Sequence, residues 1–121
     1  MKAGQEILGR LKIVNPDSPP ALSAAFMETT VEHLFGTIWA RPGLELQQRS
    51  LLTLTCLVAL NREGELYLHF RGARNLGIQK ETLEEMILHI AHYAGWPCAV
   101  TASRILEEVW TKMDAEEAAN A

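Results

Sequence analysis

Apolar residues recur at intervals of three and four along most of this chain, a spacing that places them on one face of an α-helix. The pattern predicts helices over residues 21–39, 45–60, 63–76 and 81–94, and a further helix from residue 97. Only short connections separate these segments, as in helical bundles. The sequence therefore predicts an all-α fold, a compact bundle of about five to six helices.

Glycine and proline punctuate this helical pattern. Gly77 suits the left-handed position that ends a helix, and Pro97 suits the first turn of the last helix. The alternation of Leu and Thr within 51–60 leaves a strand open as an alternative there, although the run is long for a strand and no hairpin turn or strand partner is apparent. The tail from Asp114 is expected to fray.

A proline-rich segment divides the chain near its start. Residues 15–20 contain three prolines, and each proline restricts both itself and its predecessor to non-helical backbone. The sequence therefore predicts an N-terminal arm and Pro-rich linker over 1–20, followed by one helical domain over 21–121.

Charge and hydropathy narrow the classes of partner. The formal net charge of -4 disfavours a nucleic acid or an anionic membrane surface. The longest apolar-rich run, 51–60, is too short to cross a bilayer and indicates a buried core element, and residues 1–14 lack the apolar core of a secretory signal. We therefore expect a cytoplasmic protein, in which Cys56 and Cys98 serve as small core side chains.

Three short stretches carry most of the information on function. They are Trp39-Ala-Arg41-Pro42-Gly43-Leu44 leading to Arg49-Ser50, then Glu65-Leu-x-x-His69, then Tyr93-Ala-Gly95-x-Pro97. In their order and spacing along residues 35–109, these stretches resemble the γ-carboxymuconolactone decarboxylase family.

Taken alone, the ionisable residues leave their roles open. Glu65 and His69 are four apart on one helix face, where the carboxylate can orient the imidazole and favour its protonated form, or form an ordinary exposed ion pair. His89 and Tyr93 share the same spacing and could equally be packing residues. His89-x-x-His92 has no nearby carboxylate or cysteine set, so no metal site is predicted.

Two arginines could bind a carboxylate substrate. Arg presents a planar fork that matches a carboxylate, whereas Lys presents a point charge. Arg41 and Arg49 are therefore candidate substrate-binding residues, and a surface or inter-subunit ion pair is the alternative for each. Trp39 could form a wall of the same site or belong to the core.

The resemblance implies a fold, an assembly and a reaction. Members of the family are helical proteins related to alkylhydroperoxidase D, and they form symmetric oligomers, commonly trimers or hexamers. The peroxidase relatives carry Cys-x-x-Cys shortly before the equivalent histidine, whereas Arg62 and Glu65 occupy those positions here. The implied reaction is decarboxylation of γ-carboxymuconolactone to 3-oxoadipate enol-lactone in protocatechuate breakdown, with no cofactor.

On this resemblance, His69 is the catalytic residue that stabilises the oxyanion or delivers the proton, and Glu65 holds it in place. Arg49, with Arg41 in reserve, anchors the acetate arm of the substrate, and Trp39 supplies an apolar wall. His89 or Tyr93 could share the proton transfer.

The chain departs from the family pattern in two places. Thr37 stands where decarboxylases of the family tend to carry a glutamate, and residues 4–9 only loosely match the family's glycine-rich lead-in. Three interpretations therefore stay open: this decarboxylase, a paralogue acting on another small lactone or oxo acid, and a non-catalytic helical oligomer.

Overall fold

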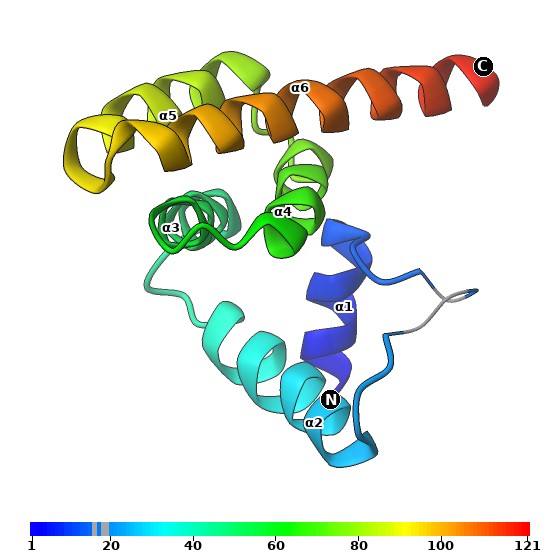
Figure 1. The fold of residues 1–121 in the computed structure, drawn as a ribbon. Coiled ribbons are helices and arrows are strands. Elements are labelled where there is room, and N and C mark those ends of the chain that lie inside the picture. Colours follow the sequence, from blue (N-terminus) through cyan, green and yellow to red (C-terminus); the bar gives the residue numbers. More distant parts are fainter. Residues whose placement is uncertain (16, 18–19) are drawn as a thin grey trace.

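The computed structural model describes residues 1–15, 17 and 20–121, and all of its regular elements are helices. Part of the predicted Pro-rich linker, at Pro16, Ser18 and Pro19, lies outside the described residues. In chain order the elements are α1 (Lys2–Leu11), α2 (Ala24–Thr29), the π-helix η1 (Thr30–Trp39), α3 (Leu46–Ala59), α4 (Glu63–Asn75), α5 (Lys80–Ala94) and α6 (Trp96–Ala119) (Figure 1).

The predicted all-α class is confirmed. The segment 51–60 is helical from its start, so the strand alternative is wrong. The left-handed cap after α4 is also confirmed, because Gly77 has a φ of 88° and the amide of Ile78 donates to the carbonyl of Ala73 at 3.0 Å.

The expected fraying of the tail is wrong, because α6 continues to Ala119. Two arginines of α4 form ion pairs with acidic residues in the last turns of α6. Arg71 lies 2.5 Å from Glu116, and Arg74 lies 2.7 Å from Asp114. Cross-helix ion pairs of this kind hold the end of α6 against α4, a contact that helical periodicity does not reveal.

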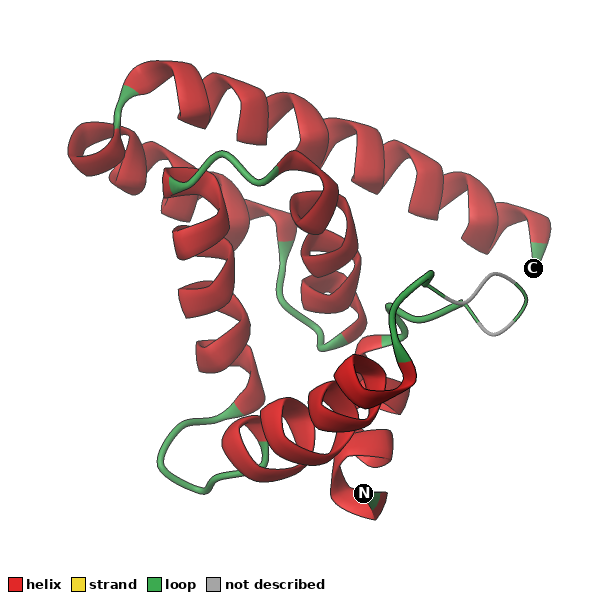
Figure 2. Cartoon of the chain, turned by 60° about the horizontal axis from the view of Figure 1, so that its bottom comes forward, coloured by secondary structure: helices red, strands yellow, loops and turns green. Residues whose placement is uncertain are grey.

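The helices form two hydrophobic clusters rather than one. The larger cluster joins α3, α4, α5 and α6, and it includes Leu54, Phe70, Leu83 and Leu106. Figure 1 shows α5 and α6 side by side above α3 and α4, and Figure 2 shows the same two layers from another side. This larger cluster is the core that the sequence pattern describes.

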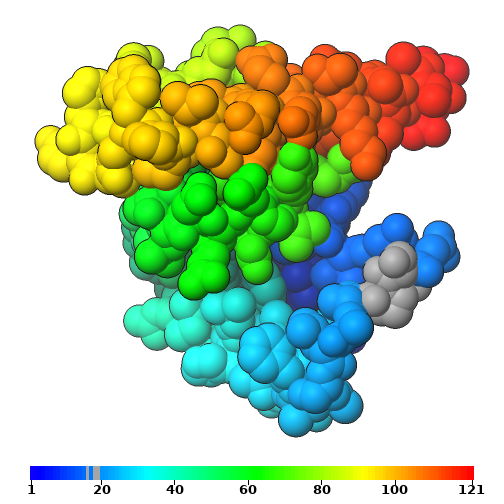
Figure 3. All heavy atoms as spheres, in the orientation of Figure 1, coloured from blue at the N-terminus to red at the C-terminus, as the bar shows by residue number. Residues whose placement is uncertain are grey.

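The smaller cluster belongs to the N-terminal part of the chain. Ile7 and Leu11 of α1 pack with Phe35 and Trp39 of η1 and with Leu76, which follows α4. The space-filling view shows the N-terminal segments and α2–η1 lying below the α3–α4 layer (Figure 3). The arm over residues 1–20 therefore contributes a packed helix, while the predicted boundary at residue 21 stays a prediction.

Close backbone approach joins α1 to both of its neighbours. A Cβ atom added to Gly4 would lie 1.8 Å from the carbonyl oxygen of Val31 in η1. A Cβ atom added to Gly72 in α4 would lie 2.9 Å from a methyl carbon of Leu11. These glycines allow α1 to fit between η1 and α4.

The expectation that both cysteines are core side chains is wrong for Cys56 and holds in part for Cys98, which packs against the larger cluster. Cys56 is exposed on α3, and Cys98 is partly buried with its thiol donating to the carbonyl of Gly95 at 3.2 Å. Cys56 shares its exposed stripe with Leu52 and Leu60, so one apolar face of α3 is uncovered in the single chain. No helix in the described part of the chain is both long and apolar enough to span a membrane.

Candidate functional site

His69 lies at the junction of the two hydrophobic clusters. It projects from α4 onto Trp39 at the end of η1, and the two rings are stacked with centroids 6.3 Å apart and planes at 27°. Trp39 is buried, and Nδ1 of His69 is buried without a hydrogen-bond partner among the described residues. The structure thus brings together two of the residues that the sequence analysis selected.

Burial controls the protonation of His69. Loss of solvent around the ring lowers the pKa of His69, and the negative charge of Glu65 opposes this effect only in part. The net direction is opposite to the one expected from Glu65 alone, because Glu65 itself is exposed to solvent. At neutral pH the buried ring is therefore favoured in its neutral form, which carries one N–H donor and one acceptor nitrogen.

This lowered pKa makes stability depend on pH. An unfolded imidazole titrates near about 6.5, so between that value and the lower folded pKa the unfolded chain binds more protons. The contribution of neutral His69 to the free energy of unfolding is complete above about pH 6.5. It is lost as the pH falls from that value through the lower pKa of the folded chain. Urea unfolding at about pH 7.5 and about pH 5.5 should show a smaller acid loss in His69→Gln than in the wild type. Equal losses in both chains would contradict this assignment.

Arg49 lies at the N-terminal end of α3 and is fixed by the preceding loop. Its Nη2 donates to the carbonyl oxygen of Arg41 at 3.1 Å, and its Nε is buried without a partner in the described chain. The side chain is thus held by a neutral acceptor rather than by a carboxylate of the chain, and the alternative of an ion pair is not seen within the described residues. Its positive charge remains available to an anion.

Arg41 borders a hollow of about 520 Å³ between α1 and the loop before α3. Trp39 also lines this hollow, so the indole contacts His69 and borders the hollow as well. Arg10 of α1 contributes a second cation, which the sequence analysis does not select because it predicts an arm over residues 1–20. Two acidic residues, Glu6 and Glu45, also contribute to the lining.

His89 and Tyr93 lie elsewhere. Their rings contact each other on the exposed side of α5, with centroids 5.1 Å apart, and Tyr93 is 79% exposed. His89 borders a separate hollow between α3 and α5, whose lining includes Leu51 and Thr55 but neither His69 nor Trp39. A role for His89 or Tyr93 in the reaction stays a prediction.

Thr37 also faces away from this junction. Its hydroxyl donates to the carbonyl of Glu32 in its own helix at 3.3 Å, and it borders a shallow hollow with His33. Thr37 therefore lies on a neighbouring face of η1 rather than at the contact between Trp39 and His69.

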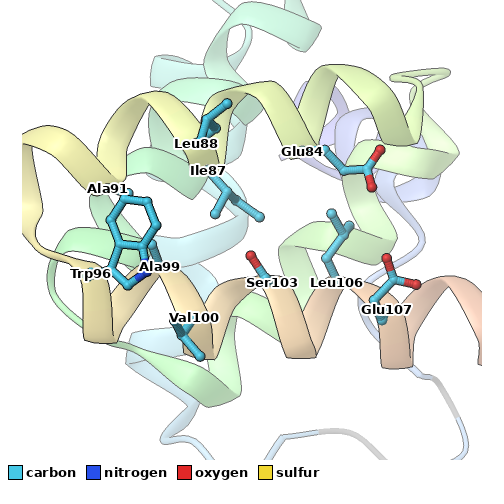
Figure 4. A pocket seen from close by; sticks show the side chains of 10 residues that line it. All are labelled: Glu84, Ile87, Leu88, Ala91, Trp96, Ala99, Val100, Ser103, Leu106 and Glu107. Atoms are coloured by element: carbon cyan, nitrogen blue, oxygen red, sulfur yellow. The ribbon is translucent and has the colours of Figure 1, made fainter.

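A further concave feature runs between α5 and α6. It is an apolar groove of about 370 Å³, and Figure 4 shows the side chains of both helices around it. Leu88, Trp96 and Val100 line it and are each about half exposed. None of the predicted site residues lines this groove. Nor do the described residues contain a group of three or more His, Cys, Asp or Glu side chains placed to hold a metal ion.

Comparisons with known proteins identify relatives of the central part of the chain. Residues 24–108 match the carboxymuconolactone decarboxylase family. The chain is 46% identical over 76 residues to 4-carboxymuconolactone decarboxylase of Acinetobacter baylyi, which covers 63% of this chain and 57% of that protein. It is 40% identical over 86 residues to nitrosuccinic acid decarboxylase npaB of Metarhizium robertsii, which covers 71% of this chain and 60% of that protein. The aligned part therefore spans less than two thirds of either relative.

Proposed function

Because the chain belongs to the carboxymuconolactone decarboxylase family, we propose that it decarboxylates γ-carboxymuconolactone to 3-oxoadipate enol-lactone without a cofactor. The observation that carries this proposal is the partly buried His69, stacked on Trp39 within the matched region. The named relative at 46% identity supports the substrate. As a carboxy-lyase, the protein would act on a small carboxylate.

The reaction needs electrostatic stabilisation and one proton. The bond between the ring carbon and its carboxylate breaks, carbon dioxide leaves, and the electron pair moves through the conjugated double bond onto the lactone carbonyl oxygen. The resulting dienolate takes a proton on carbon from the N–H of His69, while the other ring nitrogen of His69 takes a proton from water, and the product is the enol-lactone. Neither the loss of carbon dioxide nor the protonation requires an oxidant or a reductant.

We assign these tasks to the residues at the junction of the two clusters. The neutral ring of His69 donates an N–H hydrogen bond to the carbonyl oxygen as negative charge develops there. Glu65, at the exposed rim, partly offsets the burial effect on this imidazole. Trp39 provides an apolar wall that disfavours the charge of the leaving carboxylate, so its loss as carbon dioxide relieves an unfavourable state.

Arg49 serves as the anchor for the acetate arm, and Arg41 supports it through the backbone contact. We expect Arg49→Lys to lower kcat/KM by about tenfold to a hundredfold, because Lys keeps the charge and loses the planar fork. The matched control is Arg104→Lys, at an exposed position of α6, which should leave kcat/KM unchanged. Steady-state kinetics with the lactone measure both variants, and equal values for Arg49→Lys and the wild type would remove Arg49 from the site.

A second candidate is decarboxylation of another small acid. The relative named nitrosuccinic acid decarboxylase, at 40% identity, and the presence of Thr37 favour this alternative. Turnover of nitrosuccinate but not of the lactone would select it.

We further propose that the chain forms a homo-oligomer, a trimer or a hexamer, in the cytoplasm. Support comes from the exposed apolar residues of the α5–α6 groove and from the uncovered stripe of α3. The two free thiols agree with a reducing compartment. Light scattering of the purified chain tests the assembly, and a mass of 13.5 kDa would contradict it.

A further inference from the structure

Ser50 is a buried polar residue to which the proposed reaction assigns no task. Its side chain is 0% exposed, and its Oγ makes no hydrogen bond to any residue that the structure describes. Thr55, five residues further along α3, pairs its hydroxyl with the carbonyl of Leu51 at 2.7 Å. Ser50 does not make the equivalent bond within α3, and a buried hydroxyl without a partner is costly.

Two other buried polar atoms share this condition. They are Nε of Arg49 and Nδ1 of His69. Ser50 lies between Leu46, which packs against the smaller cluster, and Leu54, which belongs to the larger one. His69 stacks on Trp39 of the smaller cluster, and the next residue of α4, Phe70, belongs to the larger one. Ser50 and His69 thus lie where the two clusters meet, and Arg49 precedes Ser50 on α3.

The register of α3 against α4 places Ser50 about one helical turn from the level of His69. Gln47 donates to the carbonyl of Leu76 at 3.2 Å, and the two helices are antiparallel neighbours joined by a short loop. Counting back from this contact sets Ser50 level with Ala73. His69 lies four residues before Ala73, about 6 Å along the axis of α4.

We propose that Ser50 is a positioning residue, whose hydroxyl acts with Nε of Arg49 to hold one buried water that donates to Nδ1 of His69. Arg49 supplies an N–H donor, the neutral imidazole supplies an acceptor nitrogen, and a hydroxyl can do either. A buried water typically makes about three hydrogen bonds to such unpaired groups, so the number and the polarity of the atoms match.

This water determines which ring nitrogen of His69 carries the proton. A hydrogen bond accepted at Nδ1 fixes the remaining ring proton on Nε2. In the proposed reaction, Nε2–H then points at the substrate oxygen with the ring already oriented. Ser50 contributes through His69 and does not touch the substrate, and this part of the inference rests on the proposed function.

Two measurements without substrate test the water itself. A high-resolution crystal structure of the wild-type chain should show one ordered water within about 3.2 Å of Ser50 Oγ, Arg49 Nε and His69 Nδ1. In ¹⁵N spectra of the histidine-labelled chain, the Nδ1 resonance of His69 should move downfield in Ser50→Ala, because that nitrogen loses hydrogen bonding. A direct bond from Ser50 to the carbonyl of Leu46, or an unchanged resonance, would overturn the proposal.

Kinetics test the consequence. Ser50→Ala should lower kcat with the lactone by about tenfold and leave KM nearly unchanged, because ground-state binding is retained. Ser103→Ala, the same change at an exposed position of α6, is the control and should leave kcat unchanged. Equal kcat values for Ser50→Ala and the wild type would overturn the role of Ser50. A wild type inactive on the lactone would instead overturn the proposed function and leave the crystal and ¹⁵N results to decide on Ser50.

Discussion

Replacing His69 by Gln should lower kcat with γ-carboxymuconolactone by about a hundredfold to ten-thousandfold, the range that general-acid help and oxyanion stabilisation supply. Gln retains a hydrogen-bonding side chain of similar reach and is acceptable within a helix. It cannot reproduce the ring stacked on Trp39 or deliver a proton. The loss should therefore appear in kcat, with the helical circular dichroism of the chain unchanged.

The control for this variant is His92→Gln. His92 is exposed on α5, and its Nδ1 lies 2.8 Å from the carbonyl of Leu88 in its own helix. Its replacement should leave kcat within about twofold of the wild type. Full turnover by a folded His69→Gln protein would show that the proton comes from another group, with His89 and Tyr93 the next residues to change.

Replacing Gly4 by Ala should lower the free energy of unfolding by about 1–3 kcal/mol, the range expected when added volume is forced into packed structure. The new Cβ would lie 1.8 Å from the carbonyl oxygen of Val31, so α1 and η1 must separate. Such a shift would also disturb Trp39 at the end of η1. Chemical unfolding followed by circular dichroism measures the change.

Gly9→Ala is the matched control on the same helix. No atom lies within 4 Å of the added Cβ at Gly9, and Ala has the higher helix propensity. This variant should therefore gain about 0.5–1 kcal/mol of stability. A Gly4→Ala protein as stable as Gly9→Ala would mean that α1 does not pack against η1 as described.

The helices of the body could be predicted because each repeats apolar residues at helical spacing and ends at a glycine, a proline or a short polar turn. The segment around Leu83 and Ile87 shows this clearly, and both residues are buried in the larger cluster. Gly77 was predictable as a cap because glycine readily adopts the left-handed conformation in which many helices end. The tail was not, because its order depends on Arg71 and Arg74, which lie far away in sequence.

Cys56 shows that an apolar pattern does not predict which positions are buried. An apolar helix suggests burial on several faces, yet α3 leaves Leu52, Cys56 and Leu60 exposed in the single chain. Periodicity reports which positions are apolar, and it does not report which surface covers them. The same ambiguity applies to Trp96 in the groove between α5 and α6.

Among the proposed site residues, His69 and Arg49 were selected through the family motif rather than through spacing alone. The contact between Trp39 and His69 could not be foreseen, because it joins two helices that are distant in sequence. Ser50 was missed although it stands beside Arg49 in the same motif. A single serine in a helix carries no signal of burial, and only the three-dimensional packing reveals its unpaired hydroxyl.

The most direct test of the central claim is an ultraviolet assay of the purified wild-type chain with γ-carboxymuconolactone generated in place by coupled enzymes. The proposal predicts that enol-lactone forms well above the spontaneous rate, and that this excess depends on His69. A folded, helical preparation that leaves the spontaneous rate unchanged would contradict the proposal and shift attention to another small acid as the substrate.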